Sequence, residues 1–327
     1  MSQIHCPSRN LRSRYKKGRR RQEPVPKILD LPPELLYEIG SHLNIYQRFR
    51  FSQTCRTTRV FFGEDWEEFI PSRPLSSRLE FYSGVAATMA DAYCCAACGA
   101  LHPVDEHDTP ATSRYKVRAC QHALQRKLGQ TYNIREAHVQ IALKLCQPRY
   151  RAGHRDFLRQ LMEPYRRKGR SLVRWSTAVF FEAVPRIVRG RFLLRTTHEW
   201  VTASWESMAP LDVVGHHVCP HQELVSWHPG RQSARTEFEQ RVLGLFEGGS
   251  CGQALRGFCR QCRTDVEFVV NPGHARVTAW HDFGGPKTPD SWEWRDHVRG
   301  ETMDDERLAR PDFKTSWRVK ERFEGGW

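Results

Sequence analysis

Residues 28–43 read ILDLPPELLYEIGSHL, and this stretch decides the fold of the first part of the chain. Pro32 and Pro33 suit the start of a helix, where a missing N–H group has no helical partner in any case. The apolar residues around them recur at intervals of three to four and form one stripe. They are Leu31, Leu35, Leu36, Ile39 and Leu43. We expect this stripe to be apolar surface that binds a partner in a helix-in-groove manner.

Two further short amphipathic runs follow this first helix. One contains Ile45 and Phe49, and the other extends from Cys55 to Phe62. A unit of three short helices has too little interior to bury all of these faces by itself. The sequence therefore predicts a small helical module that needs a partner, a metal or a neighbouring domain.

The motifs of this module resemble those of an F-box. Residues 28–36 are similar to the start of an F-box, and the run Ser-Gln-Thr-Cys-Arg at 52–56 is similar to its middle. The resemblance covers residues 28–68 and implies a three-helix module that docks on the small adaptor of an SCF-type cullin-RING ubiquitin ligase. The adaptor-binding positions that it implies are Leu31, Pro32, Leu35, Leu36, Ile39 and Leu43. The alternative is that the apolar stripe packs internally against residues 71–93.

The positive charge of the chain is concentrated in two blocks. The 327 residues include 51 Lys and Arg against 37 Asp and Glu, a formal charge of +14. Residues 1–27 hold nine cations and one acid, which predicts a disordered basic tail. Such a tail is a nuclear import signal, a nucleic-acid arm or a solvated segment without a partner. Residues 144–195 hold fourteen cations and three acids among apolar residues, a pattern typical of the charged outer face of packed helices, with an acidic target surface as the alternative.

The composition also excludes several classes of protein. No apolar run approaches the roughly 18 residues that a membrane-spanning helix needs. The N-terminal charges are not followed by the apolar core of a secretory signal. The 11 cysteines, an odd number in a chain without such a signal, favour reduced thiols and metal sites over disulfides. We therefore expect a protein of the nucleus, the cytoplasm or both, with no membrane partner.

Residues 71–327 are predicted to form an α+β region that recognises a target protein. We expect a helix within 79–93, a loop over 94–120 and two helices within 131–165. Short β-rich runs follow, and Asn271-Pro-Gly is typical of a hairpin turn. These runs are 179–184, 187–194, 266–270 and 277–280. The tail 300–327 is predicted to be helical or disordered. This region is similar to the cysteine-bearing region found downstream of the F-box in many fungal F-box proteins.

Two Cys-X-X-Cys pairs predict zinc sites, because two thiolates at this spacing can bind one tetrahedral Zn²⁺. For the pair Cys259 and Cys262 the best additional ligands are Cys219 and His221, which would complete a structural Cys₃His site. The first site is predicted to contain Cys95, Cys98 and Cys120, with His122, His102 or Cys146 as the fourth ligand and Cys94 as a variant of the first. The bracing metal is thus expected to be structural zinc.

No catalytic motif is recognisable in the sequence. It contains no His-Glu-X-X-His zinc motif, phosphate loop, nucleophile elbow or dinucleotide fingerprint. We therefore predict a non-catalytic substrate receptor of an SCF-type ligase, with the adaptor, through it a cullin, and an unknown target protein as partners. The alternative is a nuclear zinc-containing protein that binds nucleic acid through its basic segments.

Overall fold

The computed structural model describes residues 28–112, 125–128, 132–171, 176–203, 207–226, 236–247, 252–285, 292–298 and 318–325. These residues divide into two compact units. The first unit contains residues up to Leu43 together with Arg48–Gly63, and the second contains Asn44–Gln47 and the chain from Glu64 onward. The predicted basic tail, residues 1–27, lies outside the described residues.

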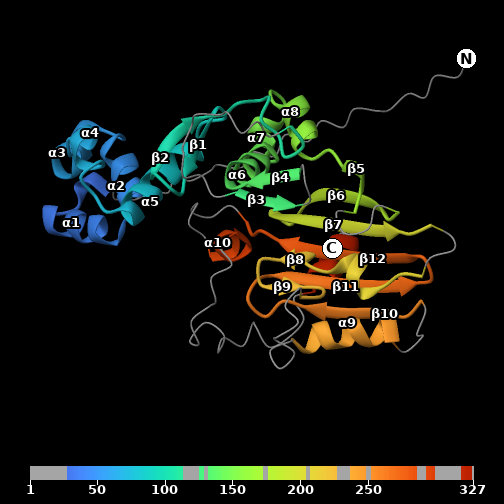
Figure 1. Cartoon of the computed structure of the whole chain (residues 1–327). Helices are drawn as coiled ribbons and strands as arrows, with labels where there is room; N and C mark the ends of the chain where they lie inside the picture. Colours follow the sequence, from blue (N-terminus) through green and yellow to red (C-terminus); the bar gives the residue numbers. More distant parts are fainter. Residues whose placement is uncertain are drawn as a thin grey trace, which may run out of the picture. The chain divides into compact units, whose positions relative to one another are not determined.

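The first unit is helical, as predicted. A 3₁₀ turn, η1 (Ile28–Asp30), precedes α1 (Pro33–His42), α2 (Ile45–Ser52) and α3 (Arg56–Phe62) (Figure 1). Pro33 opens α1 because its missing N–H would have no partner in the first helical turn. Cys55 caps α3: its Sγ accepts a hydrogen bond from the Thr58 N–H at 3.5 Å, and its own N–H donates to Thr58 Oγ1 at 3.3 Å. These bonds fix where the third helix begins.

The second unit begins with helices and a hairpin. Its first elements are α4 (Trp66–Phe69), α5 (Leu75–Ala86), β1 (Ala92–Cys95) and β2 (Ala100–Pro103), and the two strands are antiparallel. The helix predicted within 79–93 therefore ends at Ala86, and the loop predicted from residue 94 is wrong where β1 and β2 pair. Cys94 and Cys95 face opposite sides of β1. With only four residues, this strand is too short for its alternation of side chains to predict a strand from the sequence.

A second hairpin and three helices follow. They are β3 (Gln125–Leu128), β4 (Tyr132–Arg135), α6 (Glu136–Leu145), α7 (Pro148–Arg151) and α8 (Arg155–Leu161). The two helices predicted within 131–165 correspond to α6 and α8, but the stretch opens with the strand β4, and a further short helix, α7, lies between the two. Lys144 of α6 is buried, and its ammonium group donates to the carbonyls of Ala86 and Ala92. This lysine therefore joins α6 to the end of α5 and to β1.

A six-stranded antiparallel sheet forms the centre of the second unit, in the order β10-β11-β12-β7-β6-β5 (Figure 1). The strands are β5 (Tyr165–Arg170), β6 (Ala178–Val188), β7 (Arg191–Val201), β10 (Ala254–Phe258), β11 (Thr264–Asn271) and β12 (His274–Asp282). The hairpin predicted at Asn271-Pro-Gly is the turn between β11 and β12. The run predicted as one strand over 187–194 is instead split by a tight turn, because Arg189 and Gly190 both have positive φ angles, 50° and 71°.

The two faces of this sheet differ. One face is buried under apolar side chains of α6, α8 and β4 and, further along, of α9 (Glu237–Glu247) and η2 (Pro210–Val213). On the other face Val319 and Phe323 of α12 (Val319–Gly325) pack on Leu193 and Trp280. The remaining described elements are the short hairpin of β8 (His217–Cys219) with β9 (Gln222–Glu223) and the helix α10 (Trp292–Val298). The predicted α+β class is consistent with this mixture of helices and an antiparallel sheet.

The basic block 144–195 does not form the outer face of packed helices throughout. Its first part lies in α6, α7 and α8, but from Tyr165 onward it forms β5, β6 and the start of β7. The prediction was wrong for β5 because its sequence, YRRKGR, has no apolar alternation. The segment Tyr165–Arg170 is a strand because it pairs with β6, and not because its residues favour a strand by themselves.

Candidate functional site

The apolar stripe of α1 divides into an inner and an outer row. Leu36 is only 2% exposed and lies in the same inner row as buried Gly40, whereas Leu35, one position earlier, is 49% exposed. Ile39 and Leu43 are half-buried, as is Leu31, and Pro32 is exposed. Of the six predicted adaptor-binding residues, Leu35 and Pro32 are thus open to a partner, whereas Leu36 belongs to the interior of the first unit.

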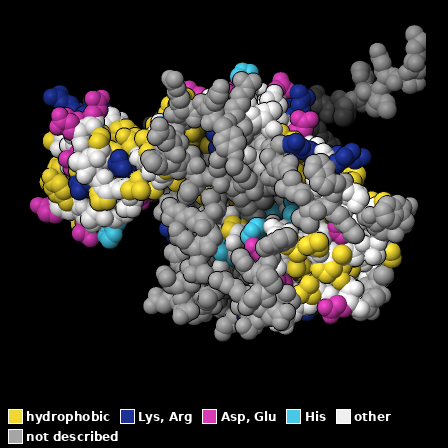
Figure 2. All heavy atoms as spheres, viewed as in Figure 1, with side chains coloured by type: hydrophobic (Ala, Val, Ile, Leu, Met, Phe, Trp, Pro, Cys, Tyr) yellow, Lys and Arg dark blue, Asp and Glu magenta, His cyan; other side chains and the backbone are white. Residues whose placement is uncertain are grey.

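Exposed apolar side chains also occur at positions that were not predicted as a site. Tyr37 of α1 is 56% exposed and Val60 of α3 is 78% exposed. The Tyr37 ring packs edge-on against Phe61, at 5.6 Å between centroids, which holds it against α3. Hydrophobic side chains are visible at the surface of this unit in Figure 2. The three-to-four spacing did not identify Tyr37, because Tyr37 lies off the apolar stripe that begins at Leu31.

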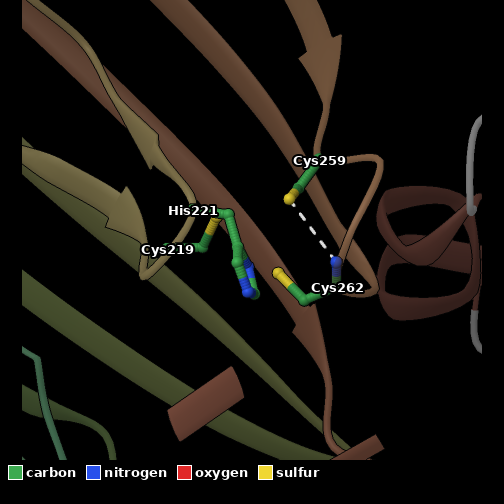
Figure 3. Close-up of side chains that lie close together, drawn as sticks. All are labelled: Cys219, His221, Cys259 and Cys262. Carbon is green, nitrogen blue, oxygen red and sulfur yellow. Dashed lines mark hydrogen bonds between the residues drawn. The ribbon is translucent and has the colours of Figure 1, made fainter. Parts of the chain in front are cut away.

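The second cysteine group converges at the ends of two hairpins (Figure 3). Cys219 ends β8 and His221 follows in the turn to β9, while Cys259 follows β10 and Cys262 precedes β11. One ligand atom of each residue lies within 4.8 Å of those of the other three. Tetrahedral zinc with bonds of about 2.3 Å to sulfur needs ligand atoms about 3.8 Å apart. The predicted set of four is therefore brought together by the fold.

The polar atoms of this group fit a bound cation. Both ring nitrogens of His221 are buried, and neither has a hydrogen-bond partner in the described part of the chain. The N–H groups of Gln261 and Cys262 donate to Cys259 Sγ at 3.3 Å and 3.4 Å, as expected of a turn that presents a thiolate. Unpartnered imidazole nitrogens beside three thiols are the donor set that structural zinc prefers.

Burial and mutual contact also shift the pKa values of these thiols. Hydrogen bonds with Cys219 and Cys262 lower the pKa of Cys259, whereas burial and the two neighbouring thiols raise the pKa of Cys262. Three thiols in one buried cluster cannot all ionise without a compensating positive charge. A bound divalent cation would supply that charge.

Residues around the cluster form a hydrogen-bonded shell that the sequence did not reveal. Thr264 Oγ1 lies 3.2 Å from Cys262 Sγ and 3.1 Å from Nδ1 of His281, which is fully buried. Nε2 of His297, on α10, lies 3.4 Å from the same hydroxyl. These contacts orient a ligand in the way that outer residues of metal sites do. No motif signals them, because Thr264, His281 and His297 are separated in sequence.

The first cysteine group is smaller than predicted among the described residues. Cys95, Cys98 and His102 of the β1–β2 hairpin bring their ligand atoms within 4.8 Å of one another, and Cys98 Sγ lies 3.1 Å from His102 Nε2. Cys120 and His122 lie outside the described residues. The alternative ligand Cys146 is not part of this group.

Cys94 is not part of the first group either, so the variant spacing that used it is wrong. Its thiol points to the other side of β1, 3.9 Å from the Leu79 carbonyl oxygen, and burial raises its pKa to about 12. Cys94 is therefore an ordinary core residue.

Comparison with known families assigns the first unit. The family model of the F-box domain matches residues 28–65. This chain contains an F-box domain. No curated protein and no solved structure matches the chain significantly. Because the family match ends at residue 65, the likeness of the later region to the cysteine-bearing region of fungal F-box proteins stays a prediction.

The F-box domain implies a role in protein–protein interaction, since F-box domains bind the adaptor of cullin-RING ligases and F-box proteins are generally non-catalytic subunits. Among the residues that the structure describes, no helix has the length and apolar character required to cross a membrane.

Proposed function

We propose that this protein is the substrate receptor of an SCF-type cullin-RING ubiquitin ligase. The observation that carries the proposal is the F-box domain at residues 28–65. In this role the F-box binds the adaptor, and the unit from Glu64 onward binds the target protein. The protein performs no bond chemistry of its own; it raises the effective concentration of the target near the ubiquitin-carrying partner. The nucleus, the cytoplasm or both is the proposed location.

Exposed apolar side chains of the F-box support adaptor binding. Leu35 and Val60 are large and accessible, and burying a leucine at an interface contributes about 1.5–3 kcal/mol. Leu36 contributes differently, because it stabilises the interior of the domain. A test of docking must therefore change Leu35 and leave Leu36 intact.

Structural zinc is part of the proposal for the second unit. Cys219, His221, Cys259 and Cys262 would hold one ion, and Cys95, Cys98 and His102 would supply three ligands of another. Zinc bound at the four-residue group would supply a crosslink between two hairpins and no reaction chemistry, since a closed four-ligand site leaves no position for a substrate.

The decisive experiment measures binding of the purified full chain to the recombinant adaptor. We expect Leu35→Asp to weaken binding at least about tenfold, because a charge replaces a contact at the interface. The matched control is Leu211→Asp, since Leu211 of η2 is 51% exposed and lies outside the F-box. Circular dichroism of both variants reports whether they fold. Adaptor binding unaffected by Leu35→Asp would contradict docking through this row of α1.

A further inference from the structure

The strand β5 forms one edge of the six-stranded sheet and carries a concentrated positive charge. Its six residues are YRRKGR, of which all but Tyr165 are exposed. Figure 2 shows Lys and Arg side chains gathered where Figure 1 draws β5. An edge strand presents backbone N–H and C=O groups that can pair with a further strand. The described residues place no strand beyond β5.

The side chains of β5 border a groove of about 490 Å³. Arg166 and Lys168 lie on the sheet face that also carries Phe180 and Glu182, their direct partners on β6. Arg166 is bound to Glu182 at 2.6 Å, and Glu182 also binds Arg195 at 2.9 Å, so this end of the groove is held in place. The Lys168 ammonium lies 5.3 Å from the centre of the Phe180 ring.

Most of the positive charge of β5 is not neutralised within the described chain. Arg167, Lys168 and Arg170 form no ion pair with a carboxylate of the described residues. Residues two apart on a strand share a face, so Lys168 and Arg170 face the same side at a spacing of about 7 Å. An extended partner with acidic residues at every second position has the matching spacing.

We propose that β5 binds an extended acidic segment of the target protein, which adds to the sheet as a further strand. Backbone hydrogen bonds to β5 would provide affinity, and carboxylates opposite Lys168 and Arg170 would provide specificity. The proposal rests on the proposed function, because it names the kind of segment that the substrate receptor recognises.

The charges of β5 and of the groove beside it disfavour two other occupants. A second copy of the chain, paired edge to edge through β5, would bring four cations against four cations, which is destabilising. A nucleic acid that lies across the sheet would meet the carboxylates of Glu182 and Glu199, which line the same groove. An acidic peptide that pairs with the edge strand β5 would instead lie next to the cations of β5.

The test uses the purified full chain and a fluorescein-labelled octapeptide of alternating glutamate and threonine, followed by anisotropy. Two further peptides carry N-methyl groups on the glutamates only or on the threonines only. In a β-strand alternate N–H groups point to opposite sides. One methylated peptide should therefore lose binding at least about tenfold and the other should bind like the parent. Equal behaviour of the two methylated peptides would overturn strand addition.

Charge reversal tests the role of β5 itself. Lys168→Glu with Arg170→Glu should weaken peptide binding about tenfold or more. The matched control is Arg155→Glu with Arg159→Glu, which reverses two exposed cations of α8 and should leave binding unchanged. Equal loss in both pairs of variants would show non-specific attraction and overturn the proposal. Tighter binding of a single-stranded oligonucleotide of the same net charge, abolished by the β5 changes, would also overturn it in favour of nucleic acid.

Adaptor binding, measured on the same preparations, separates this proposal from the proposed function. A chain that binds the adaptor but not the acidic peptide refutes only the role of β5. A chain that binds the peptide but not the adaptor refutes the ligase role and leaves strand addition standing.

Discussion

Removal of a ligand from the Cys219, His221, Cys259 and Cys262 cluster should release one equivalent of zinc and loosen the second unit. We choose Cys262→Ser, because the Cys262 thiol is fully buried and a serine hydroxyl is a poor zinc ligand. The substitution is nearly isosteric, so it leaves no large cavity. A loss of stability would therefore report the ion and not the packing.

The expected size of the effect follows from the chain length between the hairpins. About 40 residues separate Cys219 from Cys259, and closing a loop of this length by a crosslink stabilises a protein by about 4 kcal/mol. Zinc bound to the unfolded chain would reduce this value. We therefore expect the free energy of unfolding to fall by up to about 4 kcal/mol.

The assay is urea unfolding of the wild type and the variant in reducing buffer, with and without a chelator, together with zinc analysis. The chelator should destabilise the wild type more than Cys262→Ser, because the variant retains only the ion proposed at Cys95, Cys98 and His102. Cys146→Ser is the control, since Cys146 is half-buried and belongs to neither cluster. Equal zinc content in wild type and Cys262→Ser, with no effect of chelator on either, would refute the reasoning.

Two further predictions concern packing and pH. Gly40→Ala should destabilise the F-box by about 1–3 kcal/mol, because the new Cβ would lie 2.3 Å from Cε1 of buried Phe62. Gly244→Ala in α9 is the control with the opposite sign, about 0.5–1 kcal/mol more stable in urea unfolding, since nothing lies within 4 Å of its added Cβ. Burial lowers the pKa of Lys144 from 10.5 to about 8. Between about pH 8 and pH 10.5, Lys144 is protonated in the unfolded chain but has lost its proton in the folded chain. The free energy of unfolding should therefore rise with pH over this range. Lys144→Met should remove this rise, and an unchanged pH profile in that variant would contradict it.

Local sequence rules predicted the elements whose signals are local. Pro33 and the spacing of Leu35 and Ile39 placed α1 correctly, and Asn271-Pro-Gly placed the β11–β12 turn. They failed where a strand is too short or too polar to carry a periodic signal. The β1–β2 hairpin has strands of four residues, too short for a periodic signal, and β5 is a strand because β6 pairs with it.

The candidate metal sites were predictable to different degrees. The Cys-X-X-Cys spacing of Cys259 and Cys262 is a local signal, and the structure places this pair within 4.8 Å of the predicted partners Cys219 and His221. The third described member of the first group, His102, was one of several alternatives, because only hairpin register places it opposite Tyr93, beside Cys95 and Cys98. The shell of Thr264, His281 and His297 had no sequence signal at all.

The sequence by itself determined that this chain contains an F-box, because that module is built from helices whose caps, prolines and apolar spacing are read within a few residues. It also paired Cys95 with Cys98 and Cys259 with Cys262 by their spacing. Only the tertiary structure decided that Leu36 faces inward while Leu35 faces outward, since one helical position turns a side chain by about 100°. Only the sheet decided that the basic segment YRRKGR is an exposed edge, because strand order depends on contacts between residues that are far apart in the chain.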